Sequence, residues 1–302
     1  MIDLHTHSNA SDGTLSPTDL VEAAKKEGLS ALALTDHDTI NGLEEGRERA
    51  RKLGLRFIPG VEFEINWVQK GRAKHPAEDS AVCGADIPVE YPTRGVFHLL
   101  GLGLTGPGRD FTGAIEELGR LREKRNLQIL DVMGKMNIPG TYEDIKKYAG
   151  GSVVGRPHFA SFLIERKLAA NIQQAFAKYL SKGKPLFVPR DALDLDRALE
   201  LIHNAGGKAV LAHPLSLYVS WGRLPELLRA WKDRGLDGIE AWHPTAKERA
   251  AMRLEELGRS LGLLITAGSD FHGASRLERR LGYSAGNRKI DDRFLDELGI
   301  EG

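Results

Sequence analysis

Seven short apolar runs, separated by stretches with helical periodicity, are the feature that most constrains the fold of this chain. The runs lie at 2–4, 31–35, 57–64, 96–104, 209–212, 238–241 and 264–267. Strands that alternate with helices are typical of a parallel sheet covered by helices. The 302 residues are enough for one large α/β domain, or for a core with an insertion. We therefore expect an α/β fold.

Helix-boundary signals support this alternation. Ser16 can cap a helix, Pro17 suits a first turn, and Asp19 occupies the capping-box position. The helix that they open is predicted to run to Glu27 and to stop at Gly28. A second helix is predicted at 42–52.

Two segments depart from the alternation. Residues 67–95 carry charges, prolines and glycines without a hydrophobic period, which predicts a long structureless loop, either a functional flap or a mobile segment. Residues 110–180 show helical patterns only, at 115–136, 142–148, 158–166 and 172–180. We therefore expect a helical insertion domain at 107–183 within a core formed by 1–106 and 184–302.

Charge and cysteine content exclude several classes of protein. The 42 Lys and Arg residues balance 42 Asp and Glu residues, so no stable binding of duplex DNA is expected. Cys83 is the only cysteine, which excludes an intrachain disulfide and a thiolate metal site. No apolar stretch is long enough to span a membrane, and the first residues lack a signal-peptide pattern. We expect a cytoplasmic protein without membrane association.

Histidines and carboxylates recur where the predicted strands end. His5 and His7 follow the first strand, with Asp12 five residues later, and Asp270 and His272 follow the last strand with the same spacing. Further members lie on or after the intervening strands, at His37, Glu62, His98 and His213. In a parallel α/β barrel the carboxyl ends of the strands converge on one site, so these side chains are expected to meet.

The pattern favours a metal site. Residues two apart on an extended strand point to the same side, so His5 and His7 can grip one ion together. Imidazole and carboxylate ligands without thiolates suit zinc, manganese or iron(II). A single buried histidine is usually a hydrogen-bonded core residue, which is how we interpret His75 and His203. That explanation is strained for the whole set, because seven of the ten histidines lie on or just after predicted strands.

Six motifs together resemble the polymerase and histidinol phosphatase (PHP) superfamily of metal-dependent phosphoesterases. They are Asp3-Leu4-His5-Thr6-His7, Ser11-Asp12-Gly13-Thr14, Leu34-Thr35-Asp36-His37-Asp38, Gly60-Val61-Glu62, Ala212-His213-Pro214 and Gly268-Ser269-Asp270-Phe271-His272. Asp12, the segment 155–160 and the segment 179–185 make the chain similar to the branch of nucleoside 3′,5′-bisphosphate phosphatases and 5′-3′ exoribonucleases. The resemblance implies a distorted seven-stranded (β/α) barrel with a helical insertion domain.

The resemblance also implies two to three divalent ions, with Mn²⁺ preferred and Zn²⁺ or Fe²⁺ as alternatives. One ion would take His5, His7, Glu62 and Asp270; a second would share Glu62 and add His98 and His213; a third would use Asp12, His37 and His272. The cluster would activate a bound water, with Glu62, His37 and His272 in catalytic roles. Three divalent ions outweigh the charge of the three carboxylates in this set, so a phosphate ester is the expected substrate.

Three residues around the predicted insertion are candidates for binding substrate phosphate: Arg156, His158 and Lys184. The structural alternative is that Arg156 caps a helix or pairs with Glu165. The expected ligand is a small phosphorylated nucleotide or the end of a short single-stranded RNA. The expected reaction is hydrolysis of the 3′-phosphate of a nucleoside 3′,5′-bisphosphate, or removal of nucleotides from short RNA in the 5′-3′ direction.

Three other functions remain open from the sequence. One is a histidinol-phosphate phosphatase of the same superfamily, and another is a non-catalytic PHP module that binds a partner. The third is a metal-dependent amide hydrolase, which would share the barrel and the ligands. The complete ligand set argues against the non-catalytic module, and the helical insertion with Arg-Pro-His argues for the nucleotide branch.

Overall fold

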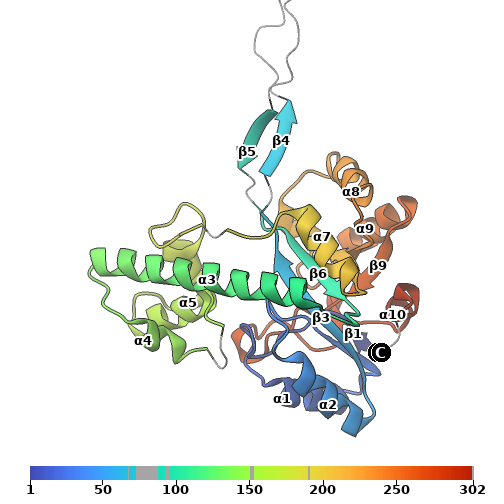
Figure 1. The fold of residues 1–302 in the computed structure, drawn as a ribbon, viewed down its shortest axis with the longest axis horizontal. Helices are drawn as coiled ribbons and strands as arrows, with labels where there is room; N and C mark the ends of the chain where they lie inside the picture. The colour runs from blue at the N-terminus through green and yellow to red at the C-terminus, as the bar shows by residue number, and fades with distance from the viewer. Residues whose placement is uncertain (67, 73–87, 93–94, 150–152, 190, 301–302) are drawn as a thin grey trace, which may run out of the picture.

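Seven strands of the computed structural model form one sheet that curls into a nearly closed barrel with helices packed around it (Figure 1). The structure describes residues 1–66, 68–72, 88–92, 95–149, 153–189 and 191–300. The sheet has the order β1 (Ile2–Asp3), β2 (Ala31–Leu34), β3 (Arg56–Glu64), β6 (His98–Leu102), β7 (Lys208–Leu211), β8 (Gly238–Trp242) and β9 (Leu264–Ala267). The predicted seven-stranded barrel is confirmed.

The helices follow the strands as the hydrophobic pattern predicts. The barrel carries α1 (Pro17–Lys26), α2 (Leu43–Leu53), α7 (Leu195–Asn204), α8 (Leu224–Lys232), α9 (Glu248–Ser260) and α10 (Arg293–Leu298). Short elements complete it: the 3₁₀ turns η2 (Pro214–Leu217), η3 (Gly273–Ser275) and η4 (Ala285–Asn287), and a small ribbon of β10 (Tyr283–Ser284) and β11 (Arg288–Lys289). At the start of α1, the Ser16 hydroxyl accepts a hydrogen bond from the Asp19 N–H at 3.0 Å, as predicted. Every helix in the described ranges is too short or too polar to cross a membrane.

The two ends of the sheet approach each other and bring the first and last motifs together. Thr6 pairs with Phe271 in a parallel bridge, and the His7 N–H donates to the Phe271 carbonyl at 2.9 Å. The stretch after β1 therefore lies beside the stretch after β9. This closure places the His-x-His and Asp-x-His motifs side by side, although they are more than 260 residues apart in the chain.

One strand runs against the others, which corrects the expectation of a fully parallel sheet. β6 is antiparallel to both β3 and β7, and His98 on β6 is paired with Glu64 on β3. A parallel neighbour needs a crossover connection, usually helical, and no helix is described between β3 and β6. His98 is the first residue of β6, so the amino end of this strand, not its carboxyl end, reaches the site.

The expectation of a structureless loop at 67–95 is wrong for part of that segment. β4 (Val68–Arg72) and β5 (Pro88–Pro92) pair as an antiparallel ribbon that stands away from the barrel (Figure 1). A two-stranded ribbon that stands away from the barrel needs no hydrophobic alternation, which explains why no strand pattern is visible at 68–72 and 88–92. His75 and Cys83 lie outside the described residues.

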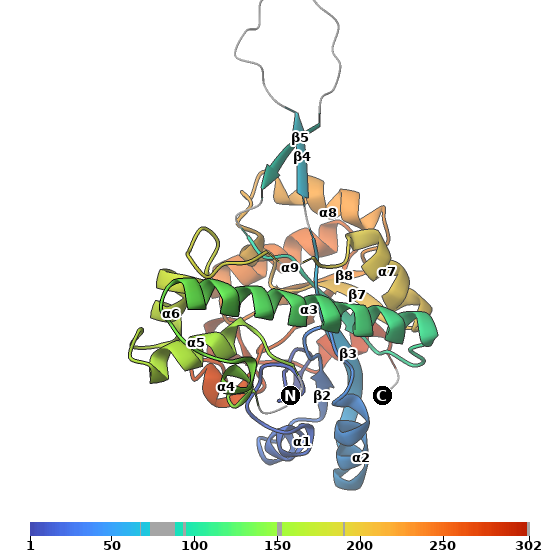
Figure 2. The same cartoon turned by 60° about the vertical axis from the view of Figure 1, so that its left-hand side comes forward.

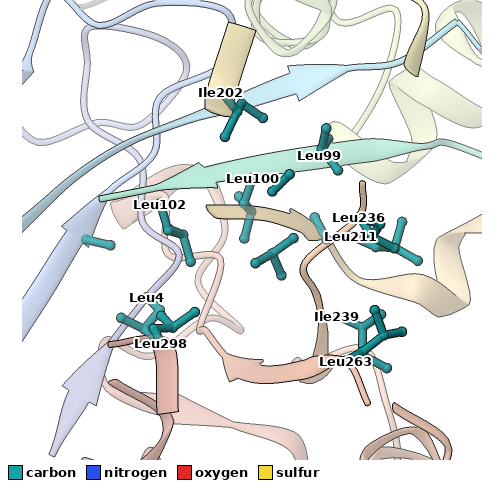
Figure 3. Packing of buried hydrophobic residues seen from close by; sticks show 14 of the residues in the cluster. Leu4, Leu99, Leu100, Leu102, Ile202, Leu211, Leu236, Ile239, Leu263 and Leu298 are labelled. Carbon is teal, nitrogen blue, oxygen red and sulfur yellow. The ribbon is translucent and has the colours of Figure 1, made fainter. Parts of the chain in front are cut away.

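Three hydrophobic cores stabilise the described part of the chain, and the smallest of them packs α1 and α2 against β2. The largest core lies inside the barrel and against its helices, with Leu99, Leu100, Leu211 and Ile239 among its fully buried members (Figure 3). Each such side chain contributes about 1.5–3 kcal/mol through burial. Because strand side chains alternate, the same strands that bury these residues also turn polar groups toward the site.

The second core belongs to the helices beside the barrel, seen around α3 in Figure 2. They are α3 (Arg109–Lys135), α4 (Tyr142–Lys146), α5 (Arg156–Glu165), α6 (Ile172–Ala175) and the π-helical turn η1 (Phe176–Leu180). α3 packs in both cores, through Phe111 and Leu118 in the barrel and through Ile129 and Met133 in the second core. We call the helices from α3 to η1 the helical cap. α3 joins this cap to the barrel, because it packs in both cores. The bounds 107–183 of the insertion stay a prediction.

Candidate metal centre

The predicted ligands converge at one edge of the sheet, and Glu62 on β3 lies at the centre of them. Its Oε1 atom is 2.8 Å from His98 Nδ1 and 3.1 Å from His213 Nε2. Glu62 is 1% exposed, so its charge is almost completely removed from solvent. Glu62 can therefore serve two groups of ligands, one on each carboxylate oxygen.

The first group surrounds Glu62 Oε2. This oxygen lies 3.3 Å from His5 Nε2 and 3.2 Å from His7 Nε2, and the two imidazole nitrogens are 3.1 Å apart. Asp270 Oδ1 completes the group at 3.6 and 3.3 Å from the same two nitrogens. His5, His7 and Asp270 satisfy the geometry of a possible metal site.

A third group gathers around Asp12. Asp12 Oδ1 is 3.2 Å from His272 Nε2, 3.9 Å from His37 Nε2 and 4.0 Å from His7 Nδ1. These four residues also form a possible metal site, and a further one combines His37, Glu62 and His98. His37 links the groups, because its Nδ1 lies 3.0 Å from Glu62 Oε2.

Unpartnered polar atoms show that these residues fit a set of cations. Four buried atoms in the described residues of the cluster have no hydrogen-bond partner: His7 Nδ1, Asp12 Oδ1, Glu62 Oε2 and His272 Nε2. Buried polar atoms are almost always hydrogen-bonded, and here electron-pair donors face one another instead. Divalent ions between them would satisfy all four atoms.

Glu240 and His243 also contact the cluster, and neither was predicted from the sequence. Glu240 Oε1 accepts a hydrogen bond from His5 Nδ1 at 3.0 Å, and Glu240 Oε2 accepts from the His213 N–H at 2.8 Å. A proton held on His5 Nδ1 leaves the Nε2 lone pair free for a metal. His243 Nε2 lies 3.3 Å from Asp270 Oδ2. Glu240 lies in the middle of β8 and His243 directly follows the strand, and the Glu-x-x-His spacing there was the available signal.

The backbone is strained where it presents several of these groups. Asp38, His213 and Asp270 have positive φ angles of 50°, 30° and 51°. Such conformations cost about 1–3 kcal/mol each and persist where the surrounding structure enforces them, often at functional sites. Gly268 is equally constrained, because a Cβ atom there would lie 2.3 Å from the His5 Cβ.

Asp36 fixes the loop that carries Asp12. Its carboxylate accepts hydrogen bonds from the Ser8 N–H at 2.8 Å and from the Ser8 and Ser11 hydroxyls, both at 2.6 Å. Burial raises the pKa of Asp36 to about 6. Its role is therefore to hold the backbone between His7 and Asp12 in place.

Charges within the cluster shift the pKa values of its members. Burial opposes a charge on His37, but Glu62 and Asp12 outweigh it and raise the pKa of His37 to about 9. Burial and the neighbouring His272 lower the pKa of His7 to about 4. Burial works against the Glu62 carboxylate, yet His37 and His98 hold its pKa well below the usual range. Without metal, His37 therefore carries the proton that a cation would displace.

We expect metal binding to release protons near neutral pH, because His37 must lose its proton to become a ligand. At pH 7.5, titration calorimetry in two buffers of different ionisation enthalpy should detect at least about one proton released per chain. The apparent metal affinity should rise from pH 7 to 9, as the pKa of about 9 for His37 is approached. His203→Gln is the control, because His203 pairs with Asp237 away from the cluster. Binding without proton release would contradict this expectation.

A cavity of about 210 Å³ opens between the cluster and the helical cap. Its lining includes Asp12, His37, Asp38, Glu64, Val96, His98, Arg122, Arg125, Gly155, Arg156, Pro157, Phe176 and Arg276. The lining thus combines four arginines with the predicted metal ligands Asp12, His37 and His98. Such an arrangement suits an anion bearing more than one charge.

The three phosphate-binding candidates from the sequence fall in different places. Arg156 lines the cavity, and its predicted alternative partner Glu165 instead accepts a hydrogen bond from Tyr148. His158 is buried, and its Nδ1 accepts the Gly155 N–H at 2.9 Å, so it caps α5. Lys184 is exposed and is not part of the cavity lining.

Arg122, Arg125 and Arg276 were not identified from the sequence. Arg122 on α3 forms an ion pair with Asp38, which links the cap to the residue after His37. Arg125 donates from Nε to the Asn126 side chain at 3.1 Å. Arg276 donates to Asp270 Oδ2 at 2.8 Å. No sequence motif surrounds these arginines, and only the fold brings them together.

Comparisons with known proteins agree with this geometry. The sequence profile of a family described as PHP domain matches residues 3–205. A 5′-3′ exoribonuclease from Haemophilus influenzae is 35% identical over 270 residues, which cover 89% of each chain. A 3′,5′-nucleoside bisphosphate phosphatase from Chromobacterium violaceum is 28% identical over 284 residues, covering 94% of this chain and 91% of that one.

A similar fold has also been solved. A structure from Bifidobacterium adolescentis, assigned as a metal-dependent phosphoesterase, superimposes with a TM-score of 0.79 at 26% identity. The match covers 98% of this chain and 94% of that one.

Proposed function

Because this chain belongs to the PHP domain family and is a metal-dependent phosphoesterase, we propose that it hydrolyses phosphate esters of nucleotides. The reaction that we propose is removal of the 3′-phosphate from nucleoside 3′,5′-bisphosphates, or 5′-3′ removal of nucleotides from short RNA. The observation that carries the proposal is the cavity whose lining combines four arginines with members of a cluster of histidines and carboxylates. The relatives that act on RNA and on nucleoside bisphosphates support it.

The proposed metal ligands keep the grouping expected from the sequence. They are His5, His7, Glu62 and Asp270 for one ion, Glu62, His98 and His213 for a second, and Asp12, His37 and His272 for a third. The short distances within each group and the four unpartnered atoms support this assignment. Manganese, zinc and iron(II) all suit such ligands.

When bound, the ions would supply Lewis acidity and lower the pKa of water, which gives the nucleophile at neutral pH. The side chains of this chain do the rest. Glu62 would hold two of the ions, because His5 and His7 lie beside one of its oxygens and His98 and His213 beside the other. Glu240 keeps the proton of His5 on Nδ1, and Arg276 anchors the far oxygen of Asp270, so the ligands are oriented before substrate arrives.

The arginines explain why two phosphates suit the cavity better than one. With one phosphate at the cluster, Arg156 on the cavity lining is placed to neutralise a second. Guanidinium groups bind phosphate through paired hydrogen bonds, which fixes the orientation of the substrate as well as its position. The 5′-phosphate of a bisphosphate, or of an RNA end, is the group that we assign there.

A comparison of four substrates tests the proposal. Phosphate release would be measured for adenosine 3′,5′-bisphosphate, 3′-AMP, histidinol phosphate and a 5′-phosphorylated RNA. Adenosine 3′,5′-bisphosphate should exceed 3′-AMP by at least about tenfold in kcat/KM, because the second phosphate contributes binding energy that positions the scissile bond. Equal kcat/KM values for the two nucleotides would contradict the proposed second phosphate site. A preference for histidinol phosphate would support the rival phosphatase function.

Arg156→Ala should impair substrate handling and leave metal binding intact. Loss of one charge-assisted phosphate contact should lower kcat/KM for adenosine 3′,5′-bisphosphate by about one to two decades. The metal content should not change, because Arg156 lies on α5, apart from the strand ends that carry the proposed ligands. Arg120→Ala on the exposed face of α3 is the control, since Arg120 pairs with Glu117 and is not part of the cavity lining. Parent-like kinetics for Arg156→Ala would contradict the phosphate contact and indicate that Arg156 has a structural role.

A further inference from the structure

Three apolar side chains interrupt an otherwise polar cavity lining. They are Val96, Pro157 and Phe176, and each comes from a different segment around the cavity. Phe176 is the only phenyl ring among the described lining residues. Binding of metal ions and phosphate does not require an aromatic surface beside the arginines, so this ring points to another part of the ligand.

Phe176 begins a π-helical turn, which is an uncommon backbone arrangement. The Ser181 N–H donates to the Phe176 carbonyl at 2.9 Å, five residues earlier, so η1 is wider than an α-helix. π-helical turns insert one residue into a helix and occur often at functional sites. The Phe176 side chain is partly exposed, although it also packs against the second hydrophobic core.

We propose that Phe176 is the stacking surface for the nucleobase of the substrate. The inference rests on the proposed function, since it assumes a nucleotide in the cavity, and it adds the element that recognises the base. The ring of Phe176 borders the same cavity as Arg125 and Arg156. A nucleotide whose phosphates face the cluster and these arginines would therefore have its base close to Phe176. Every nucleobase has a π-face, so stacking on Phe176 tolerates all four bases.

Two substitutions separate stacking from simple packing. Phe176→Leu keeps an apolar side chain for the core but removes the aromatic face, and Phe176→Tyr keeps the ring. The substrates are adenosine 3′,5′-bisphosphate and its base-free analogue, 1-deoxyribose 3,5-bisphosphate. Phe176→Leu should raise KM for the adenosine compound by about tenfold with kcat within about twofold, and Phe176→Tyr should restore the parent KM. Neither variant should change the kinetics of the base-free analogue.

A matched control comes from the same helical turn. Tyr179 packs against the same core but is not part of the cavity lining, so Tyr179→Leu disturbs the cap without touching the proposed stacking surface. Its kinetics on both substrates should match those of the parent. Equal losses on the two substrates for Phe176→Leu would overturn the proposal, and so would unchanged kinetics on both.

Binding gives a second readout that does not depend on turnover. The product of the proposed reaction, adenosine 5′-monophosphate, keeps the base, so its dissociation constant can be measured by calorimetry on the metal-loaded protein; Phe176→Leu should raise that constant by about tenfold and Phe176→Tyr should leave it unchanged. An unchanged dissociation constant in Phe176→Leu would contradict the proposed role. Failure of the parent to hydrolyse any nucleotide would contradict the proposed function instead, so the two outcomes are distinguishable.

Discussion

Glu62→Gln is expected to lower kcat by at least about a thousandfold while the fold survives. The amide keeps the size of the carboxylate but removes the negative charge that is proposed to hold two ions. Loss of about 4 kcal/mol of transition-state stabilisation corresponds to a thousandfold in rate. The substitution should also reduce the metal content, because Glu62 contacts members of every group in the cluster. Turnover and metal content measured on the same preparation would check both effects.

Controls for this variant separate a local effect from a loss of fold. Circular dichroism should show parent-like secondary structure in Glu62→Gln, since the hydrophobic core below the site is unchanged. Glu44→Gln on the exposed surface of α2 removes the same charge and should leave turnover unchanged. A kcat within tenfold of the parent would show that Glu62 does not bridge ions.

Removal of the metal ions should have an effect of similar size. Dialysis against a chelator should lower the turnover of adenosine 3′,5′-bisphosphate by at least about a thousandfold, because the proposed nucleophile depends on the ions. Addition of Mn²⁺ should restore turnover, and the concentration needed should fall as the pH rises from 7 to 9, following the pKa of His37. Full activity of protein shown to be free of metal would rule out the account.

The positions of the proposed ligands could be predicted from the sequence because the strands are short and buried. A run such as Ala31–Leu34 has little freedom to be anything but a strand in a helix-covered sheet, and His37 follows it directly. The spacing of His5 and His7 then fixes their common direction. The structure brings both into the cluster, as expected.

Long-range pairing could not be predicted in the same way. The direction of β6 depends on how the chain returns from β3, and the ribbon of β4 and β5 gives no hydrophobic pattern to indicate that path. Glu240 was missed because its partner His5 is 235 residues away in the chain. Arg122 and Arg276 were missed for the same reason, since only the packing of α3 and the turn at η3 brings them to one cavity.

The Arg-Pro-His motif is compatible with two roles for His158, phosphate binding and capping of a helix. The Arg-Pro-His spacing places Arg156 at the start of α5 and puts His158 three residues after the cap position. A histidine there can bond back to the cap backbone, which the structure shows at 2.9 Å. From the sequence alone, the bond to the cap backbone and a bond to a substrate phosphate are equally compatible with a histidine at this position.

Anomalous diffraction from crystals grown with Mn²⁺ is the most direct test of the metal centre. Two to three peaks per chain are expected within the cluster. One peak should lie between Glu62, His98 and His213, and another within reach of His5, His7 and Asp270. Any third peak should lie beside Asp12 and His272. Crystals of active protein that show no peak within reach of Glu62 would contradict the account.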